Sequence, residues 1–156
     1  MASFDILLSI ASDLTAALTA QDRYHRLLES LRRVIPFDAA ALMRLQGDEL
    51  SVIAAHGLKP DALERRFRIA DHLRLKAICA SAEPVLFPSD SPLPDPFDGL
   101  LANDPAITHG IHACLGCPLY VQDKLLGLLT ADAIEPMAFS GIDLLFVKAL
   151  AGLAAA

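Results

Sequence analysis

The sequence predicts a single α+β domain in which helices cover the faces of an antiparallel sheet of about five or six strands. Three observations carry this prediction. Apolar stripes at helical spacing occur near both ends of the chain, two hairpin patterns lie between them, and 156 residues suit one domain with a complete core. Two leading helices, a hairpin, further helices, more strands and a final helix form an order typical of this class.

Two helices are expected to open the chain and one to close it. The first spans residues 3–19, and the second begins at a capping box made by Thr19 and Asp22. Ser140 and Asp143 form a similar box before the last helix. The first and last helices are apolar enough to pack together or to pair with a second copy of the chain.

Two hairpin patterns supply most of the predicted sheet. Residues 39–45 and 49–56 are strand-like around a Gln-Gly-Asp turn, and residues 110–121 and 124–133 form a longer pair. Shorter elements are expected between them, among them a strand at 83–87.

A helix is also expected in the middle of the chain. It begins at Asp71 or His72 and runs to about Ser81, with Arg74 near its start. An arginine near the start of a short helix is ordinarily solvated, so Arg74 by itself indicates no function.

The segment 88–109 is rich in proline, and a loop of this length in a compact domain is more often functional than not. Within it, Asp95 lies between Pro94 and Pro96, which favours extended backbone at Asp95 and a short helix beginning at Pro96. One helical turn would bring Asp95 and Asp98 to the same side. They are either a simple helix start or a carboxylate pair that needs a positive charge.

Three cysteines in a chain without an export signal are expected to be reduced thiols of a cytoplasmic protein. If the second hairpin turns at 122–124, Cys114 lies opposite Asp132, and this thiol and carboxylate share a face of the sheet. Cys117 then points to the other face. This placement argues against a redox or zinc Cys-x-x-Cys motif, whose sulfurs converge on a turn.

Together these side chains form a candidate metal site. Carboxylates, a thiolate and an imidazole of mixed hardness suit ferrous iron, although zinc and manganese also fit. Arg74 is expected to bind as a counter-ion or outer hydrogen-bond donor, because arginine stays protonated in proteins. The candidate ligands are Asp95, Asp98, Cys114, Asp132 and His112.

Composition excludes several functions. A net charge of −6 and a pI of about 5.2 argue against direct contact with nucleic acid. No apolar run approaches the roughly 20 residues of a membrane span. A hydrophobic fraction of 54% and a mean hydropathy of +0.43 indicate a further buried surface, such as a homo-oligomer contact through the terminal helices.

The order of the candidate residues resembles the N-terminal GAF domain of the NorR family, the nitric-oxide-responsive transcriptional activators. The most specific part is Pro-Asp-Pro-Phe-Asp-Gly-Leu at 94–100 followed by His-Ala-Cys at 112–114. Arg74 precedes this pattern, and Leu-Thr-Ala-Asp at 129–132 follows it. The resemblance runs over almost the whole chain.

The resemblance implies a regulatory GAF domain with a mononuclear non-haem ferrous iron that binds nitric oxide. Residues 1–156 would be the N-terminal sensory piece of a longer regulator, and the isolated domain can lose its iron. The GAF domain would repress an adjacent AAA+ ATPase domain, which is followed by a helix-turn-helix domain and acts with an alternative sigma factor. The implied iron set is Arg74, Asp95, Asp98, Cys114 and Asp132.

Two departures from the family pattern limit what can be carried over. Ala80 stands where some members have a second arginine, so a role for that arginine is not expected here. Residues 104–110 look like an insertion, which leaves the geometry of this loop open.

Two alternatives to a nitric oxide sensor stay open. Some GAF domains reduce free methionine sulfoxide with a reactive cysteine and a resolving thiol, but Cys114 and Cys117 are expected on opposite faces. Others bind a small organic ligand such as a cyclic nucleotide, but no gathering of glycines or basic residues suits a phosphate. We therefore expect a sensor and not an enzyme.

Overall fold

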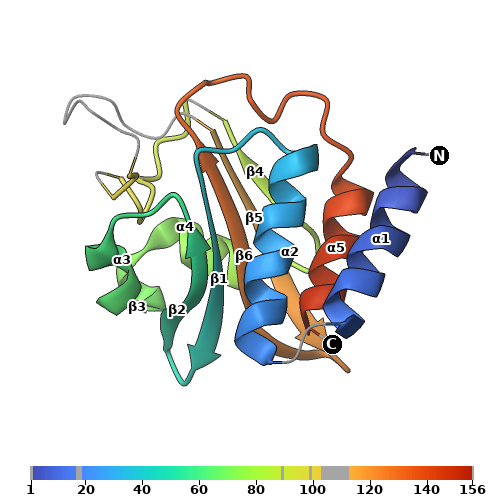
Figure 1. Ribbon diagram of the computed structural model, residues 1–156. Helices are drawn as coiled ribbons and strands as arrows, with labels where there is room; N and C mark the ends of the chain where they lie inside the picture. Colours follow the sequence, from blue (N-terminus) through green and yellow to red (C-terminus); the bar gives the residue numbers. More distant parts are fainter. Residues whose placement is uncertain (1, 17–18, 89, 99, 103–112, 156) are drawn as a thin grey trace.

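The computed structural model describes residues 2–16, 19–88, 90–98, 100–102 and 113–155, and these form an antiparallel sheet of six strands between two layers (Figure 1). The strand order is β3-β2-β1-β6-β5-β4, and each neighbouring pair is antiparallel. The predicted α+β class is confirmed. The strands are β1 (Ala39–Gln46), β2 (Glu49–His56), β3 (Arg66–Arg68), β4 (Val85–Phe87), β5 (Ala113–Val121) and β6 (Lys124–Ala133).

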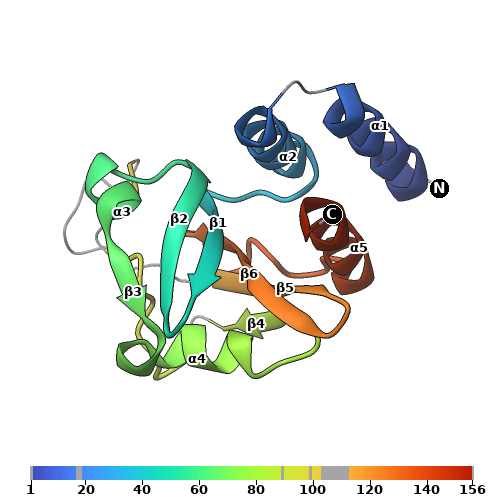
Figure 2. The ribbon, with the colours of Figure 1, turned by 90° about the horizontal axis from the view of Figure 1, so that it is seen from below.

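Three long helices lie on one side of the sheet, namely α1 (Ala2–Ala16), α2 (Ala20–Val34) and α5 (Leu144–Ala155). Of these, α2 and α5 pack on the sheet and α1 packs outside them, against both helices, while α4 (Leu73–Cys79) lies against the opposite face (Figure 2). The remaining helical elements are α3 (Pro60–Glu64) and a short 3-10 helix (Ile69–Asp71). No helix in the described ranges is both long and apolar enough to span a membrane.

Each face of the sheet has its own apolar core. The first core joins Ile10 of α1, Leu28 of α2 and Leu150 of α5 to the sheet, so the predicted packing of the terminal helices is confirmed. The second core lies under α4 and includes Phe67 and Phe97. Because neighbouring residues of a strand point to opposite faces, the four central strands contribute side chains to both cores, and the edge strands β3 and β4 contribute to the second core.

The helix starts follow the predicted capping with one difference. Thr19 caps α2 by accepting a hydrogen bond from the backbone N–H of Asp22 at 3.1 Å. The last helix begins at Leu144, and Asp143 caps it, where the sequence predicted a box opened by Ser140. Gly141 separates the two with a φ of 79°, which helical backbone does not adopt.

The hairpin of β5 and β6 differs from the prediction at its turn. The turn has two residues, Gln122 and Asp123, with φ of 49° and 67°, where three residues were expected. A bulge next to Leu119 adds one residue to β6, and the two differences cancel in the register. The predicted pairing of Cys114 with Asp132 is therefore confirmed.

The short helix expected from Pro96 is absent from the described part of this loop. Residues 95–98 form a turn, in which the backbone N–H of Asp98 donates to the carbonyl of Asp95 at 3.1 Å. The backbone N–H of Leu100 donates to the carbonyl of Phe97 at 2.9 Å, so the chain turns again at once. Successive tight turns replace a helix here, and this decides where the two carboxylates point.

Candidate metal centre

Cys114 and Asp132 face the second core from neighbouring strands. They are directly paired across β5 and β6, and Asp132 is also paired with Ala39 of β1. Both side chains are buried, and they lie on the sheet face that α4 covers. The hairpin register alone brings this thiol and this carboxylate together, as the sequence predicted.

Asp95 reaches the same place from the proline-rich loop. Its Oδ1 accepts a hydrogen bond from the backbone N–H of Phe97 at 2.8 Å, a local turn that a residue before proline adopts readily. Phe97 is buried and packs edge-on against Phe67, with ring centroids 5.3 Å apart. The aromatic ring thus anchors the loop in the second core and carries the Asp95 carboxylate inward.

Arg74 connects the loop to α4. Its Nη1 donates to Asp95 Oδ2 at 3.2 Å, and its Nε donates to the carbonyl of Leu93 at 2.7 Å. The guanidinium carbon lies 5.0 Å from the centroid of the Phe87 ring. Arg74 is therefore a buried counter-ion held at three points, and the solvated position that is ordinary for an arginine near a helix start is excluded.

One cluster contains the four buried side chains described above, each 5% exposed or less, namely Arg74, Asp95, Cys114 and Asp132. Asp95, Cys114 and Asp132 each offer a ligand atom, and the three atoms all lie within 4.8 Å of one another. When deprotonated as metal ligands, the two carboxylates and the thiolate together with one guanidinium would carry two net negative charges, which one divalent ion would cancel. The donor set of two carboxylates and a thiolate combines hard and soft ligands, which suits a divalent transition metal such as ferrous iron.

Burial strongly affects the protonation of this cluster. Burial, with Asp132 and Asp95 nearby, raises the pKa of the Cys114 thiol well above its usual value. Burial and a hydrogen bond to Asp95 likewise raise the pKa of Asp132 well above the range of an ordinary carboxyl. The Cys114 thiol therefore keeps its proton near neutrality, Asp132 keeps its proton above the pH range of an ordinary carboxyl, and a metal that binds would have to displace protons.

One buried atom supports a metal at this place. Asp132 Oδ1 has no hydrogen-bond partner among the described residues, although the same carboxyl hydrogen-bonds Asp95 and Cys114. A buried carboxyl oxygen without a partner is costly, because nothing replaces its lost hydration. A cation would supply that partner, so the residues present fit a metal ion.

Three other candidates lie elsewhere. Asp98 is exposed and does not join the group of close ligand atoms, because residues 95–98 form a turn with only the Asp95 carboxylate directed inward. His112, and the 104–110 segment before it, lie outside the described residues. Cys117 is buried in the first core, on the sheet face opposite Cys114, as predicted.

Sequence reasoning missed the two aromatic rings that support this site. Phe97 anchors the loop, and Phe87 lies under the guanidinium of Arg74. A large apolar residue between two aspartates in a polar, proline-rich loop was an available signal for Phe97. No sequence signal singles out Phe87, because its contact with Arg74 depends on the packing of β4 against α4.

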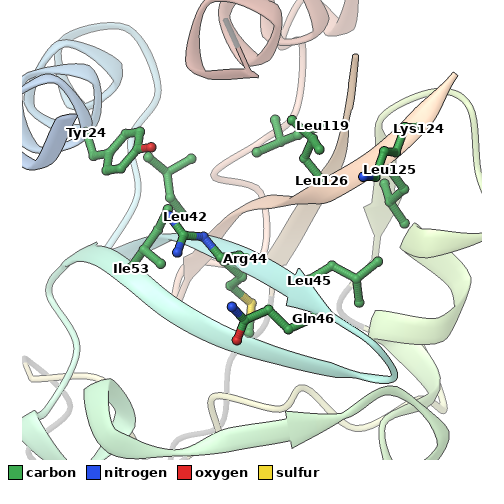
Figure 3. Close-up of a pocket in the computed structure, with 11 residues that line it drawn as sticks. Tyr24, Leu42, Arg44, Leu45, Gln46, Ile53, Leu119, Lys124, Leu125 and Leu126 are labelled. Carbon is green, nitrogen blue, oxygen red and sulfur yellow. The ribbon is translucent and has the colours of Figure 1, made fainter. Parts of the chain in front are cut away.

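A separate cavity of about 340 Å³ lies between α2 and the turn ends of both hairpins (Figure 3). Tyr24 of α2, Arg44 of β1 and Lys124 of β6 line it together with aliphatic side chains. Its described lining contains no carboxylate, thiol or imidazole. This cavity therefore has none of the metal-binding chemistry of the Asp95–Cys114–Asp132 cluster.

Comparisons with known proteins find one domain family and several regulatory proteins that are similar to this chain. A family model described as "GAF domain" matches residues 19–156. The chain is 43% identical over 156 residues to "Anaerobic nitric oxide reductase transcription regulator NorR" of Aeromonas salmonicida, covering 100% of this chain and 30% of that protein. It is 41% identical over 154 residues to "Regulatory protein LuxO" of Vibrio cholerae, covering 99% and 29%. The chain thus spans about 30% of the length of these curated relatives.

Solved structures show the same architecture. The GAF domain of a phosphoenolpyruvate-protein phosphotransferase from Coxiella burnetii is 25% identical, with a TM-score of 0.77 and coverage of 98% of this chain and 90% of that one. A free methionine-R-sulfoxide reductase from Neisseria meningitidis reaches a TM-score of 0.73 at 17% identity, covering 98% and 86%. This second likeness shows a shared fold and nothing about activity.

Proposed function

Because the GAF model matches residues 19–156, the chain belongs to the GAF domain family, and from this premise we propose that it senses nitric oxide at a mononuclear non-haem ferrous iron. One relative over 40% identical is named a transcription regulator and another a regulatory protein, which supports a regulatory role over an enzymatic one. We propose Asp95, Cys114 and Asp132 as the metal ligands, with Arg74 as their buried counter-ion.

The observation that carries this proposal is the convergence of the ligands. A loop, two strands and a helix separately bring two carboxylates, a thiol and a guanidinium into one buried cluster. Deprotonated, the two carboxylates and the thiolate would repel one another, so folding alone does not explain why they lie together. We propose that they lie together to bind a metal, since a divalent ion would balance the charge and pair with the orphaned oxygen of Asp132.

Ferrous iron, when bound, would supply an open coordination position at which nitric oxide binds. The protein's own groups do the rest. Phe97 anchors the loop in the second core, and Arg74, which lies against the Phe87 ring, holds the loop carbonyl of Leu93 and the Asp95 carboxylate to α4. A change of charge at the site therefore acts on the loop and on α4 through Arg74. Nitric oxide would shift the domain between two states only through its different affinity for them.

The whole regulator is a further part of the proposal. The relatives are about three times as long as this chain, and we infer an adjacent AAA+ domain that the GAF domain represses until nitric oxide binds. Such a regulator acts in the cytoplasm with an alternative sigma factor. Phe4 and Leu8 of α1 and Leu145 of α5 are exposed, which supports a homodimer contact through the terminal helices.

The placement of Cys114 and Cys117 does not support a methionine sulfoxide reductase that uses this pair. Cys117 lies in the first core and Cys114 in the second, so the sheet separates the two thiols. Burial raises the pKa of Cys117 to about 11, which leaves little of the reactive thiolate near neutrality. A catalytic and resolving pair needs two thiols within reach of each other.

The test is anaerobic reconstitution with ferrous iron, followed by nitric oxide and electron paramagnetic resonance. The parent is expected to bind one iron and to give a half-integer-spin signal with nitric oxide. Cys114→Ser and Asp132→Asn should lose at least tenfold in iron affinity, because each removes a ligand. Cys117→Ser is the matched control, since it changes the same group on the opposite face. A parent-like iron affinity and signal in Cys114→Ser would refute the site.

Asp98 is tested with a separate variant, because the family resemblance implies that it is an iron ligand whereas the structure leaves it exposed. If the three buried groups suffice, Asp98→Asn will bind iron as the parent does. If iron binding draws the exposed Asp98 inward, this variant will lose affinity as Asp132→Asn does.

A further inference from the structure

Thr130 is a second polar residue on the metal-facing side of β6. It precedes Asp132 by two residues, so both side chains point to the face that α4 covers. Thr130 is 2% exposed, and within the described ranges its Oγ1 has no hydrogen-bond partner. Valine would fill the same volume without a polar atom, so packing alone does not explain a threonine here.

Backbone and helix α4 pack closely around Thr130. Across the sheet it is paired with Ala41 of β1 and Gly116 of β5. A Cβ placed on Gly116 would lie 2.2 Å from Cδ1 of Ile78, so α4 packs directly on the sheet beside Thr130. An organic ligand of the size of a nucleotide would have to displace this contact.

The strand geometry places Thr130 near the candidate metal ligands. Residues i and i+2 of a strand lie about 6.7 Å apart on one face. A hydroxyl at that distance from Asp132 reaches a molecule of two or three atoms that lies over the strand between the two side chains. The two orphaned oxygens, Thr130 Oγ1 and Asp132 Oδ1, therefore border the same small region.

We propose that Thr130 hydrogen-bonds the small molecule bound at the Asp95–Cys114–Asp132 site and thereby acts as its positioning residue. This inference rests on the proposed function. The hydroxyl both donates and accepts, so it suits a diatomic ligand that carries a lone pair, for which nitric oxide is the probe. Thr130 adds no charge and would not contribute to binding the metal itself.

The test compares Thr130→Val, which removes the hydroxyl at nearly constant volume, with Thr130→Ser, which keeps it. Ferrous iron should bind to both variants within about twofold of the parent, since neither change removes a proposed ligand. With nitric oxide added, Thr130→Val should shift the infrared N–O stretching frequency and speed nitric oxide dissociation about fivefold, the worth of one neutral hydrogen bond. Thr130→Ser should return both readouts to those of the parent.

A measurement without metal separates this role from a structural one. Because Thr130→Val removes an unpaired buried hydroxyl, the metal-free variant should melt at a higher temperature than the parent. A lower melting temperature would show that the hydroxyl has an internal partner, and an unchanged N–O frequency in Thr130→Val would show that it does not touch the ligand. Either result overturns the role of Thr130 while the iron site stands. A parent without any iron-dependent nitric oxide signal overturns the proposed function and this inference together.

Discussion

The replacement Arg74→Met tests the arrangement on which the site depends. The variant keeps an apolar stem but removes the buried ion pair with Asp95 at 3.2 Å. It also removes the hydrogen bond to the carbonyl of Leu93 at 2.7 Å and the contact with the Phe87 ring. Asp95 would then be buried without a counter-charge, although it would keep its hydrogen bonds with the backbone N–H of Phe97 and with Asp132.

The magnitude follows from burial. Breaking a buried pair by removing one partner costs about 3–5 kcal/mol, because the remaining charge has lost its compensation. The hydrogen bond and the ring contact would each contribute about 1 kcal/mol more by themselves. Contributions within one network overlap, so we expect a loss of about 3–5 kcal/mol in the free energy of unfolding of the metal-free domain.

The assay is urea unfolding at neutral pH, with Arg66→Met as the matched control. Arg66 also faces a carboxylate, Glu49, but at 3.8 Å and with 76% of its side chain exposed. An exposed pair of this kind contributes about 0.5 kcal/mol or less. A loss below about 1 kcal/mol for Arg74→Met, or equal losses for the two variants, would refute the buried pair and with it the anchoring of Asp95 to α4.

Three further predictions concern the cluster and its packing. Burial and Asp95 raise the pKa of Asp132, so this carboxyl stabilises the metal-free domain at low pH and loses that contribution as pH rises through its folded pKa. Asp132→Asn has no such proton to lose, and the melting temperature of the variant relative to the parent should therefore rise as pH increases from the ordinary carboxyl range through the folded pKa of Asp132. A difference in melting temperature that does not change with pH would contradict this. Because the pKa values of Cys114 and Asp132 are raised, a metal must displace protons to bind them. Cobalt titrations followed by absorbance should therefore show metal affinity rising from pH 6 to 8, by up to about tenfold per pH unit for each proton released. A metal affinity that does not change with pH would exclude these ligands. Gly116→Ala should cost about 1–3 kcal/mol in urea unfolding, because its Cβ would lie 2.2 Å from Ile78 Cδ1, and a neutral result would mean that α4 moves freely on the sheet.

The pairing of Cys114 with Asp132 was predicted correctly, although the turn length from which it was counted was wrong. The expected turn had one residue too many, and a bulge beside Leu119 restored the register. The prediction held because the side chains of both strands alternate between two cores, and a one-residue slip would bury the wrong face of each strand. Register is set by this alternation more strongly than by the length of one turn.

For the two aspartates of the loop, the sequence alone could not predict which one joins the cluster. Asp95 and Asp98 were equal candidates, since they lie three positions apart in a segment that could begin a helix. The structure brings in Asp95 and leaves Asp98 exposed. That difference comes from the burial of Phe97 against Phe67, a contact between distant parts of the chain.

Periodicity and caps in the sequence determined the helices, the strands, and the face of the sheet on which each cysteine lies, because these depend on residues close together along the chain. Only the tertiary structure decided that Asp95 enters the cluster, that Arg74 is buried beside it, and that Thr130 lacks a partner. Those outcomes depend on how α4 and the loop pack on the sheet. Arg74 and Asp95 are 21 residues apart, and no local pattern specifies that two such side chains meet.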